Sequence, residues 1–454
     1  MKQTASRSVI VIVITVLFTA GILLYYGRLT LSGAKWATYP TNQHLYDNGK
    51  LVKAGTITDA NDVVLAQTTD GKRSFHESTD VRKATVHAVG DLEGFVSTGV
   101  HAAFLPQLTG YELINGTYNR TGEGNDMQLT IDSELCVSAM KALGSRSGTV
   151  GICNYKTGEI LCMVSTPTFD PEHASADAAA NGKGVFVNRL LSGTYTPGSI
   201  FKLVTCLSAL ENFPDFDQRT YTCEHGVTIQ NEWLSCLVDH DTLGIRDALA
   251  QSCNATFAQV ALDVGRPALT KTAEKIGFNK QLTMDGIQCA KSSYMVDDAN
   301  DIDFGWSGIG QYNDLVNPFQ YLTFMCAIAN DGVCVSPHLV KSITTPDGIR
   351  IRGESKSSSR RLSRQNAEQL QEFMRNNVLT KYGDSAFSGL ELCAKTGTAE
   401  IGKGATPHSW FVGFCQSEEK PYAFVVVVEN AGSGLGVASS IAARVLRAAE
   451  KIEG

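Results

Sequence analysis

The chain has 454 residues, of which 43% are hydrophobic and 19% are charged. This composition is typical of a globular protein and excludes a mostly disordered chain, and the length suggests two or three domains. The net charge is -7, so the protein lacks the excess of basic residues that would neutralise nucleic-acid phosphates. We therefore expect no nucleic acid among its partners.

An apolar run near the N-terminus, Val9–Tyr26, has about the length needed to cross a bilayer. Lys2 and Arg7 precede it, which favours a cytoplasmic N-terminus. A cleaved signal peptide is the alternative, but its apolar core is normally shorter, and no small-x-small cleavage site directly follows the run. We expect a cytoplasmic tail at 1–8, one transmembrane helix at 9–26, and the remaining mass outside the cytoplasm.

Residues 27–145 have the pattern of a small strand-rich domain. Short apolar runs alternate with turn residues, and three of these runs read as strands: Gly55–Asp59, Val63–Ala66 and Gln128–Asp132. We interpret this segment as an N-terminal domain whose chain follows an irregular path.

The remainder, 146–454, has the pattern of a larger α+β domain. Two apolar runs joined by a short turn, Thr149–Asn154 and Glu159–Val164, predict a β-hairpin. Helical patterns follow and strands return near the end, which predicts an antiparallel sheet flanked by helices. The expected helices are Ile200–Asn212, Leu243–Val264, Asn366–Leu379 and Val437–Lys451, and the later strands are Leu392–Glu400, Ser409–Phe414 and Tyr422–Glu429.

Twelve cysteines are many for a protein with most of its mass outside the cytoplasm. Most of them lie in apolar surroundings and are expected to be small buried side chains. Cys223 and Cys236 differ, because they flank a short hairpin-like stretch, Gly226–Trp233. They could form a disulfide, make a zinc site with His225 and His240, or remain free thiols.

The stretch Tyr195–Lys202 contains a serine and a lysine at the spacing S-x-x-K. Its first four residues read as a turn, so Ser199 is expected to open a helix, where free N–H groups and the helix dipole favour negative charge. Lys202 lies three residues on and shares a helix face with the serine hydroxyl. A lysine acts as a base for serine only where burial and nearby positive charge lower its pKa. Alone, the pattern also fits a helix cap followed by a surface lysine.

Two further short motifs fit the same kind of site. Ser252-Cys253-Asn254 lies between two helix-forming stretches, where polar side chains can point into a cleft. Lys395-Thr396-Gly397-Thr398 lies in a strand-like run, where Gly397 leaves room for a substrate backbone. On an edge strand, Lys395 adds positive potential and the hydroxyls of Thr396 and Thr398 can hold a carboxylate. Each motif is common by chance, so only their combination is informative.

The motifs S-x-x-K, S-x-N and K-T-G-T, in this order, resemble the signature of penicillin-binding proteins and serine β-lactamases. The flanking sequence narrows the resemblance to class B penicillin-binding transpeptidases, over about Arg146–Glu450. The stretches that carry it are Thr149–Pro171, Tyr195–Lys202, Gly308–Gln311 and Ala394–Glu400. The resemblance implies a transpeptidase domain of penicillin-binding type, with 27–145 as its N-terminal pedestal.

The resemblance also implies a reaction. Ser199 would attack the D-Ala-D-Ala bond of a peptidoglycan stem peptide, with Lys202 as its base, and an amine of a neighbouring stem would take the acyl group. Ser252 would relay a proton and Asn254 would donate a hydrogen bond to the substrate, while the backbone N–H groups of Ser199 and Thr398 would form an oxyanion hole. β-Lactams would acylate the same serine. No cofactor and no metal are expected in this site.

The N-terminal segment departs from the family pattern. Class B pedestals usually carry R-G-x-I-x-D-R-x-G-x-x-L-A, whereas the matching stretch Lys53–Ala66 lacks both arginines and the second glycine. The segment is also short, as in the reduced class B proteins that accompany a SEDS-family polymerase. Such a membrane partner is therefore expected.

Other members of the superfamily use the same motifs. A β-lactamase or a D,D-carboxypeptidase passes the acyl group to water, and a non-catalytic sensor or scaffold only binds. An anchored chain with a pedestal fits the first two less well, and the intact motifs argue against the third. The sequence therefore predicts a membrane-anchored D,D-transpeptidase in the plasma membrane.

Overall fold

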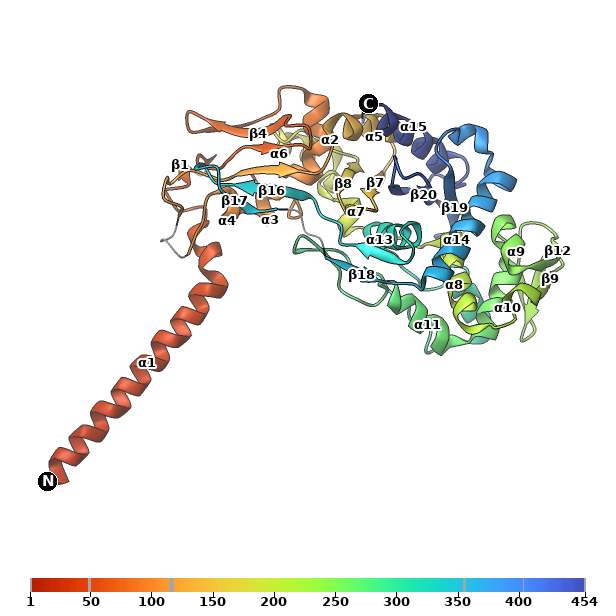
Figure 1. The fold of residues 1–454 in the computed structure, drawn as a ribbon, viewed down its shortest axis with the longest axis horizontal. Helices are drawn as coiled ribbons and strands as arrows, with labels where there is room; N and C mark the ends of the chain where they lie inside the picture. The colour runs from red at the N-terminus through yellow and green to blue at the C-terminus, as the bar shows by residue number, and fades with distance from the viewer. Residues whose placement is uncertain (1, 48–49, 114–117, 354–356, 403, 453–454) are drawn as a thin grey trace.

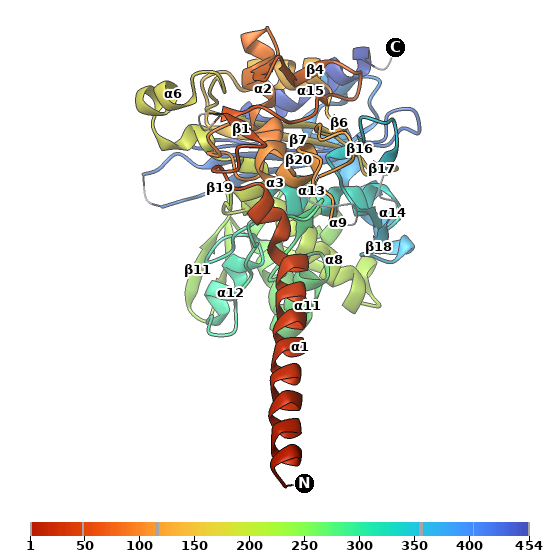
Figure 2. The same ribbon diagram turned by 90° about the vertical axis from the view of Figure 1, so that its left-hand side faces the viewer.

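The computed structural model describes residues 2–47, 50–113, 118–353, 357–402 and 404–452. The first element, α1 (Lys2–Ala37), is a 36-residue helix that points away from the rest of the molecule (Figure 1 and Figure 2). Its apolar side chains at 9–26 are exposed. It is the one helix in the described ranges that is long and apolar enough to cross a membrane, and it extends the expected span of 9–26 at both ends.

The far end of α1 is fastened to the N-terminal region. The hydroxyl of Tyr118 donates to the carbonyl oxygen of Ala37 at 2.8 Å, and the side-chain amide of Asn42 donates to the same oxygen. Gly33 lies so close to Tyr111 that a Cβ atom would be 2.6 Å from its hydroxyl oxygen. These contacts fix the direction in which the helix leaves the body.

A six-stranded sheet forms the centre of the N-terminal region. Its strand order is β17-β16-β6-β3-β4-β5. The first two strands of that order come from the later part of the chain, so the sheet joins the region 27–145 to the region 146–454. The bounds are β3 (Ile57–Thr58), β4 (Val64–Thr69), β5 (Lys72–Phe75), β6 (Asp126–Leu129), β16 (Val340–Thr344) and β17 (Arg350–Arg352).

A five-stranded antiparallel sheet lies at the centre of the larger region, in the order β19-β20-β21-β7-β8. The predicted hairpin is its β7–β8 pair, and the predicted late strands are the other three, so the α+β prediction is confirmed. All seven residues of β21 are buried, because helices cover both faces. The bounds are β7 (Gly148–Asn154), β8 (Ile160–Thr166), β19 (Leu392–Ala399), β20 (His408–Cys415) and β21 (Tyr422–Val428).

Two groups of helices enclose this sheet (Figure 1). One group packs together over β8, β20 and β21 and consists of α2 (Thr79–Val89), α5 (Ser133–Leu143) and α15 (Val437–Ile452). The other group packs against β19, β20, β21 and β7 and consists of α13 (Pro318–Ala329) and α14 (Arg364–Asn377). Two of the first group, α2 and α5, come from the N-terminal region.

A helical layer beyond α14 carries the first two motifs. It contains α8 (Lys202–Asn212), α9 (Ile245–Gln251), α10 (Asn254–Val264), α11 (Arg266–Lys275) and α12 (Asp301–Ser307). Two small antiparallel pairs project from it: β9 (Thr220–Cys223) with β12 (Asp241–Gly244), and β10 (Gly226–Ile229) with β11 (Glu232–Ser235).

Shorter elements complete the chain. The strands are β1 (Tyr46–Asp47), β2 (Lys50–Leu51), β13 (Thr283–Met284), β14 (Ile287–Gln288), β15 (Val333–Val335) and β18 (Ser358–Arg360). The helices and helical turns are α3 (Val100–Ala103), α4 (Leu105–Leu108), α6 (Ala174–Asn181), η1 (Lys183–Phe186), α7 (Arg189–Ser192), η2 (Gly198–Ile200), η3 (Phe216–Gln218), η4 (Val378–Tyr382) and η5 (Asp384–Phe387).

Candidate active site

Ser199 lies in the 3-10 turn η2, and the α-helix begins only at Lys202. The expectation that Ser199 opens the helix is therefore off by one turn. The turn is held at both ends: the N–H of Gly198 donates to the carbonyl of Gly310 at 2.8 Å, and the Tyr321 hydroxyl donates to the carbonyl of Ile200 at 2.5 Å. The backbone of Ser199 is therefore held in place just before the N-terminal end of α8.

Lys202 is completely buried, and its amine is surrounded by oxygen atoms. Its Nζ lies 3.1 Å from the Oγ of Ser199 and 3.2 Å from the Oγ of Ser252, and it donates to the Oδ1 of Asn254 at 2.7 Å. A further hydrogen bond of 2.6 Å reaches the carbonyl oxygen of Ser252. Burial disfavours the charged amine and lowers the pKa of Lys202 to about 8.

The motif Ser252–Asn254 forms the predicted connection between two helices, α9 and α10. Ser252 has a φ of 57°, in the left-handed region, which costs free energy for a residue with a side chain and is found where neighbours hold it in place. This conformation turns the Oγ of Ser252 toward both lysine amines. The side-chain N–H of Asn254 donates to the carbonyl of Ser235 at 3.2 Å.

Lys395 lies on the edge strand β19, as predicted, and its side chain is also completely buried. Its Nζ donates to the Oγ of Ser252 at 3.0 Å and to the carbonyl oxygen of Thr396 at 3.0 Å. Burial, together with the positive charge of Lys202, lowers the pKa of Lys395 well below its usual value. The hydroxyl of Ser252 therefore lies between two amines that burial pushes toward their neutral forms.

Glycines allow the strand β19 and the turn η2 to pack closely. A Cβ atom on Gly198, which has a φ of 56°, would be 2.5 Å from the carbonyl oxygen of Thr398. A Cβ atom on Gly397 would be 2.9 Å from the Ile200 side chain. The sequence predicts that Gly397 leaves room for a substrate backbone. In the structure, Gly198 and Gly397 also allow Ser199 to lie close to the strand.

A cavity of about 590 Å³ opens over these residues. Five of the predicted site residues line it: Ser199, Ser252, Asn254, Thr396 and Thr398. Lys202 and Lys395 lie beneath its floor with their amines reaching the lining hydroxyls, and Gly397 supports the strand between the two threonines. All eight predicted residues thus converge on one place.

Several residues of the cavity were missed by sequence reasoning. The hydroxyl of Tyr382 accepts from the backbone N–H of Thr396 at 3.2 Å and lies 3.2 Å from its Oγ1. Leu237, Trp306 and Tyr312 also line the space. No spacing in the sequence relates these positions to the motifs, although Tyr312 directly follows the Gly308–Gln311 stretch that carries part of the family resemblance.

Cys223 and Cys236 are free thiols in the structure. Of the two histidines considered with them, His240 lies beside their sulfurs and His225 does not belong to the group. Cys253, the middle residue of the second motif, completes the cluster. These four are the residues that could hold a metal ion within the described ranges.

Comparisons with known proteins agree with this site. Residues 148–447 match the family model described as the penicillin binding protein transpeptidase domain. Among curated proteins, the peptidoglycan D,D-transpeptidase PbpA of Mycolicibacterium smegmatis is 28% identical over 433 residues, covering 87% of this chain and 88% of that protein. The match therefore extends beyond the motifs to nearly the whole length of both chains.

Solved structures give the same result. The ceftriaxone acyl-enzyme complex of penicillin-binding protein A from M. tuberculosis superposes with a TM-score of 0.78 at 25% identity, covering 87% of this chain and 98% of that one. The D,D-transpeptidase domain from Eggerthella lenta also has a TM-score of 0.78, at 26% identity and with 88% and 99% covered. The chain belongs to the penicillin-binding transpeptidases, as its three motifs suggested.

Proposed function

We propose that this protein is a peptidoglycan D,D-transpeptidase in which Ser199 is the nucleophile and Lys202 its base. The observation that carries the assignment is the convergence of two buried lysine amines on the hydroxyls of Ser199 and Ser252. Burying a lysine amine is costly even when it is hydrogen-bonded, so a pair of them facing two serines in a cavity points to proton transfer.

The first step forms an acyl-enzyme. The Oγ of Ser199 attacks the carbonyl carbon of the penultimate D-Ala, and its proton passes to the neutral amine of Lys202. Negative charge develops on the carbonyl oxygen, which the backbone N–H groups of Ser199 and Thr398 stabilise. The close contact of Gly198 with Thr398 supports this pairing, because it holds the turn and the strand side by side.

The second half of the step expels the terminal D-Ala. Its nitrogen takes a proton from the Oγ of Ser252, which is replenished from the ammonium of Lys202 or from Lys395. Both amines are within 3.2 Å of that oxygen. An incoming amine from a neighbouring stem reverses the proton path, attacks the ester and restores Ser199.

The substrate binds at the rim of the cavity. Thr396 and Thr398 line it from β19, and their hydroxyls bind the terminal carboxylate. Asn254 can donate one amide hydrogen to a substrate carbonyl, because its hydrogen bond to Ser235 uses only one of the two. β-Lactams carry a matching carboxylate and occupy the same positions.

The protein is proposed to lie in the plasma membrane through α1, with its catalytic region outside the cytoplasm. Lys2 and Arg7 before the apolar run support this orientation. We assign 27–145 to a pedestal and 146–454 to the transpeptidase domain. The shortness of the pedestal supports a SEDS-family polymerase as membrane partner, and co-purification of the two from detergent would test it.

Covalent labelling tests the nucleophile. The full chain in detergent should react with fluorescent penicillin, and mass spectrometry should place the adduct on the peptide that contains Ser199. Ser199→Ala should remove the label, because it removes the hydroxyl that the Lys202 amine approaches at 3.1 Å. Ser433→Ala, which changes another serine of the cavity lining, should label normally.

Product analysis tests the acceptor. A peptide ending in D-Ala-D-Ala, supplied with a D-amino acid as acceptor, should yield the exchanged peptide in excess over the hydrolysed one. Hydrolysis alone would identify a carboxypeptidase, and labelling that survives in Ser199→Ala would refute the assigned nucleophile.

A further inference from the structure

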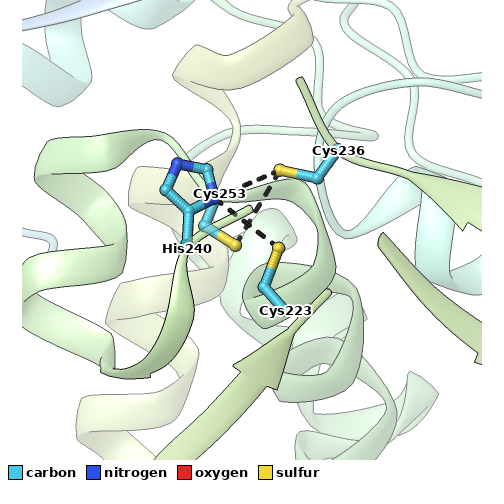
Figure 3. Close-up of side chains that lie close together, drawn as sticks. All are labelled: Cys223, Cys236, His240 and Cys253. Atoms are coloured by element: carbon cyan, nitrogen blue, oxygen red, sulfur yellow. Dashed lines mark hydrogen bonds between the residues drawn. The ribbon is translucent and has the colours of Figure 1, made fainter. Parts of the chain in front are cut away.

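A second cluster of reactive side chains lies next to the Ser252–Asn254 turn. Figure 3 shows three thiols and an imidazole pointing toward one another. They come from four separate places in the local fold: Cys223 ends β9, Cys236 follows β11, His240 precedes β12, and Cys253 joins α9 to α10. Their donor atoms all lie within 4.8 Å of one another.

The distances within the cluster match a tetrahedral metal site. With Zn–S bonds of about 2.3 Å and Zn–N bonds of about 2.05 Å, tetrahedral geometry places two sulfurs about 3.8 Å apart and a sulfur and a nitrogen about 3.6 Å apart. The Sγ atoms of Cys236 and Cys253 are 3.9 Å apart. The Nδ1 of His240 lies 3.6 Å from the Sγ of Cys223 and 3.5 Å from that of Cys236.

The surroundings suit thiolates. The backbone N–H of Asn254 donates to the sulfur of Cys236 at 3.3 Å, and the N–H of Thr256 donates to the sulfur of Cys253 at 3.4 Å. The Thr256 hydroxyl donates to Cys253 as well, at 3.3 Å. Such donors stabilise negative charge on sulfur and orient the ligand. A disulfide would involve only two of the three thiols, and it would not explain why the third thiol and the imidazole lie beside them.

We propose that Cys223, Cys236, His240 and Cys253 bind one zinc ion in a closed, four-coordinate structural site. The ligand set Cys₃His is one that structural zinc sites use, and all four positions are filled by protein, so no place remains for a reacting water. The ion would stabilise the local fold and would take no part in the catalysed reaction.

The position of Cys253 gives the site a consequence for the cavity. Cys253 is bonded to Ser252 on one side and Asn254 on the other, and both of these contact the amine of Lys202. Cys236 and His240 bracket a short loop whose Leu237 lines the cavity although 93% of its surface is exposed. Zinc would therefore hold Ser252 in its left-handed conformation and keep this loop in place, a role that rests on the function proposed above.

Metal analysis of the purified full chain tests the site directly. Protein prepared without chelators should contain about one zinc ion per chain. Cys236→Ala and His240→Asn should each lower the zinc content at least about tenfold. Substitution with Co²⁺ should give the d–d absorption of tetrahedral cobalt together with sulfur-to-metal charge transfer, both lost in the two variants.

Matched controls separate loss of a ligand from loss of the fold. His225→Asn changes the neighbouring histidine outside the cluster, and Cys289→Ala changes a buried cysteine elsewhere; both should keep their zinc. Wild-type protein avoids mutation altogether: a chelator should lower its Tm and slow penicillin labelling, and added zinc should restore both.

The outcomes distinguish this inference from the proposed function. A metal-free protein that labels normally, or one with a disulfide between any two of the three cysteines, would overturn the zinc site while leaving Ser199 as the nucleophile. Bound zinc lost in the two ligand variants supports the site even if no labelling is seen. Zinc retained in both variants would also overturn it.

Discussion

The hydroxyl of Ser252 lies between two buried lysine amines, and their burial explains how a lysine can serve as a base near neutral pH. Lys202 and Lys395 are both fully buried and both approach the same oxygen. Burial disfavours the positive charge of both amines, and the charge of Lys202 further disfavours that of Lys395. The pair therefore gives up a proton at a lower pH than an exposed lysine does.

Acylation should follow the neutral amine of Lys202. Because its pKa is lowered to about 8, the neutral fraction rises about tenfold for each pH unit below 8 and levels off above it. The second-order rate constant for acylation by benzylpenicillin should rise in the same way between pH 6 and 9. It can be measured by quenching the reaction at set times and labelling the remaining free enzyme. Lys202→Arg, which keeps the charge but has no accessible neutral form, should react at least about 100-fold more slowly at every pH. A flat profile in the wild type would contradict the assigned base.

At the scale of elements, the contact between the turn η2 and the strand β19 defines the site. Gly198 and Gly397 each allow an approach that a side chain would block. Trp410 on the neighbouring strand β20 reinforces this contact, because its indole N–H donates to the carbonyl of Thr196 at 3.1 Å. Backbone packing therefore places Ser199 beside the K-T-G-T strand. The amines of Lys202 and Lys395 lie beneath the floor of the cavity between them.

Gly198→Ala should separate the turn from the strand. The added Cβ would be 2.5 Å from the Thr398 carbonyl oxygen, and a φ of 56° is already unfavourable for alanine. We expect the penicillin acylation rate to fall by about tenfold or more, since small displacements of reacting groups have effects of this size. Gly286→Ala is the matched control, because its φ of 87° carries the same backbone strain while a Cβ there meets no atom within 4 Å. Equal rates in the two variants would show that the contact is not needed.

The sequence was sufficient for the elements that have a strong periodic pattern. The five strands of the central sheet and the closing helix were predicted within a few residues, because helices cover both faces of the sheet and most of its strands are apolar runs bounded by turn residues. The three motifs were expected at one site, and the structure places their eight residues around one cavity, while the roles given to them stay predictions. The strand and helix predictions depended on patterns within single segments, whereas the grouping of the motifs depended on their order and on the family resemblance.

What the sequence left open depends on contacts between distant segments. The 3-10 turn at Ser199 follows from hydrogen bonds with Gly310 and Tyr321, which no local pattern contains. Tyr382 reaches Thr396 from η4, which follows α14. Cys253 meets Cys236 only because the strand pairs β9–β12 and β10–β11 pack against α10. The pairing of β16 with β6 joins residues more than 200 positions apart, and no local signal predicts it.

At the scale of the molecule, the two regions share structure. Strands β16 and β17 complete the N-terminal sheet, while α2 and α5 cover the central one. A bidentate ion pair adds to this, with Arg82 of α2 bonded to Asp170 beyond β8 at 2.8 and 2.6 Å. Within the N-terminal region, Asp59 accepts from the Ser133 hydroxyl at 2.6 Å, which holds the start of α5 in place over the central sheet.

Truncation should reveal this sharing. A chain that begins at residue 38 keeps every one of these contacts, so it should be soluble and should label with fluorescent penicillin at the wild-type rate. A chain that begins at residue 146 exposes the face of the central sheet under α2 and α5 and leaves β16 without its partner. It should aggregate and label at least about tenfold less, as judged by size-exclusion chromatography and gel fluorescence. A soluble, reactive 146–454 would show that the regions are independent.

The single helix α1 has a mechanical consequence. At 1.5 Å per residue its 36 residues measure about 54 Å, whereas the bilayer interior is about 30 Å thick. The part of the helix that extends beyond the bilayer interior forms a stiff stalk. Hydrogen bonds from Tyr118 and Asn42 hold its C-terminal end. In the proposed membrane orientation, each residue inserted between the bilayer and Ala37 would raise the cavity by about 1.5 Å and rotate it by about 100° about the helix axis. The distance and direction at which the cavity meets the cell wall would then depend on the length of this helix.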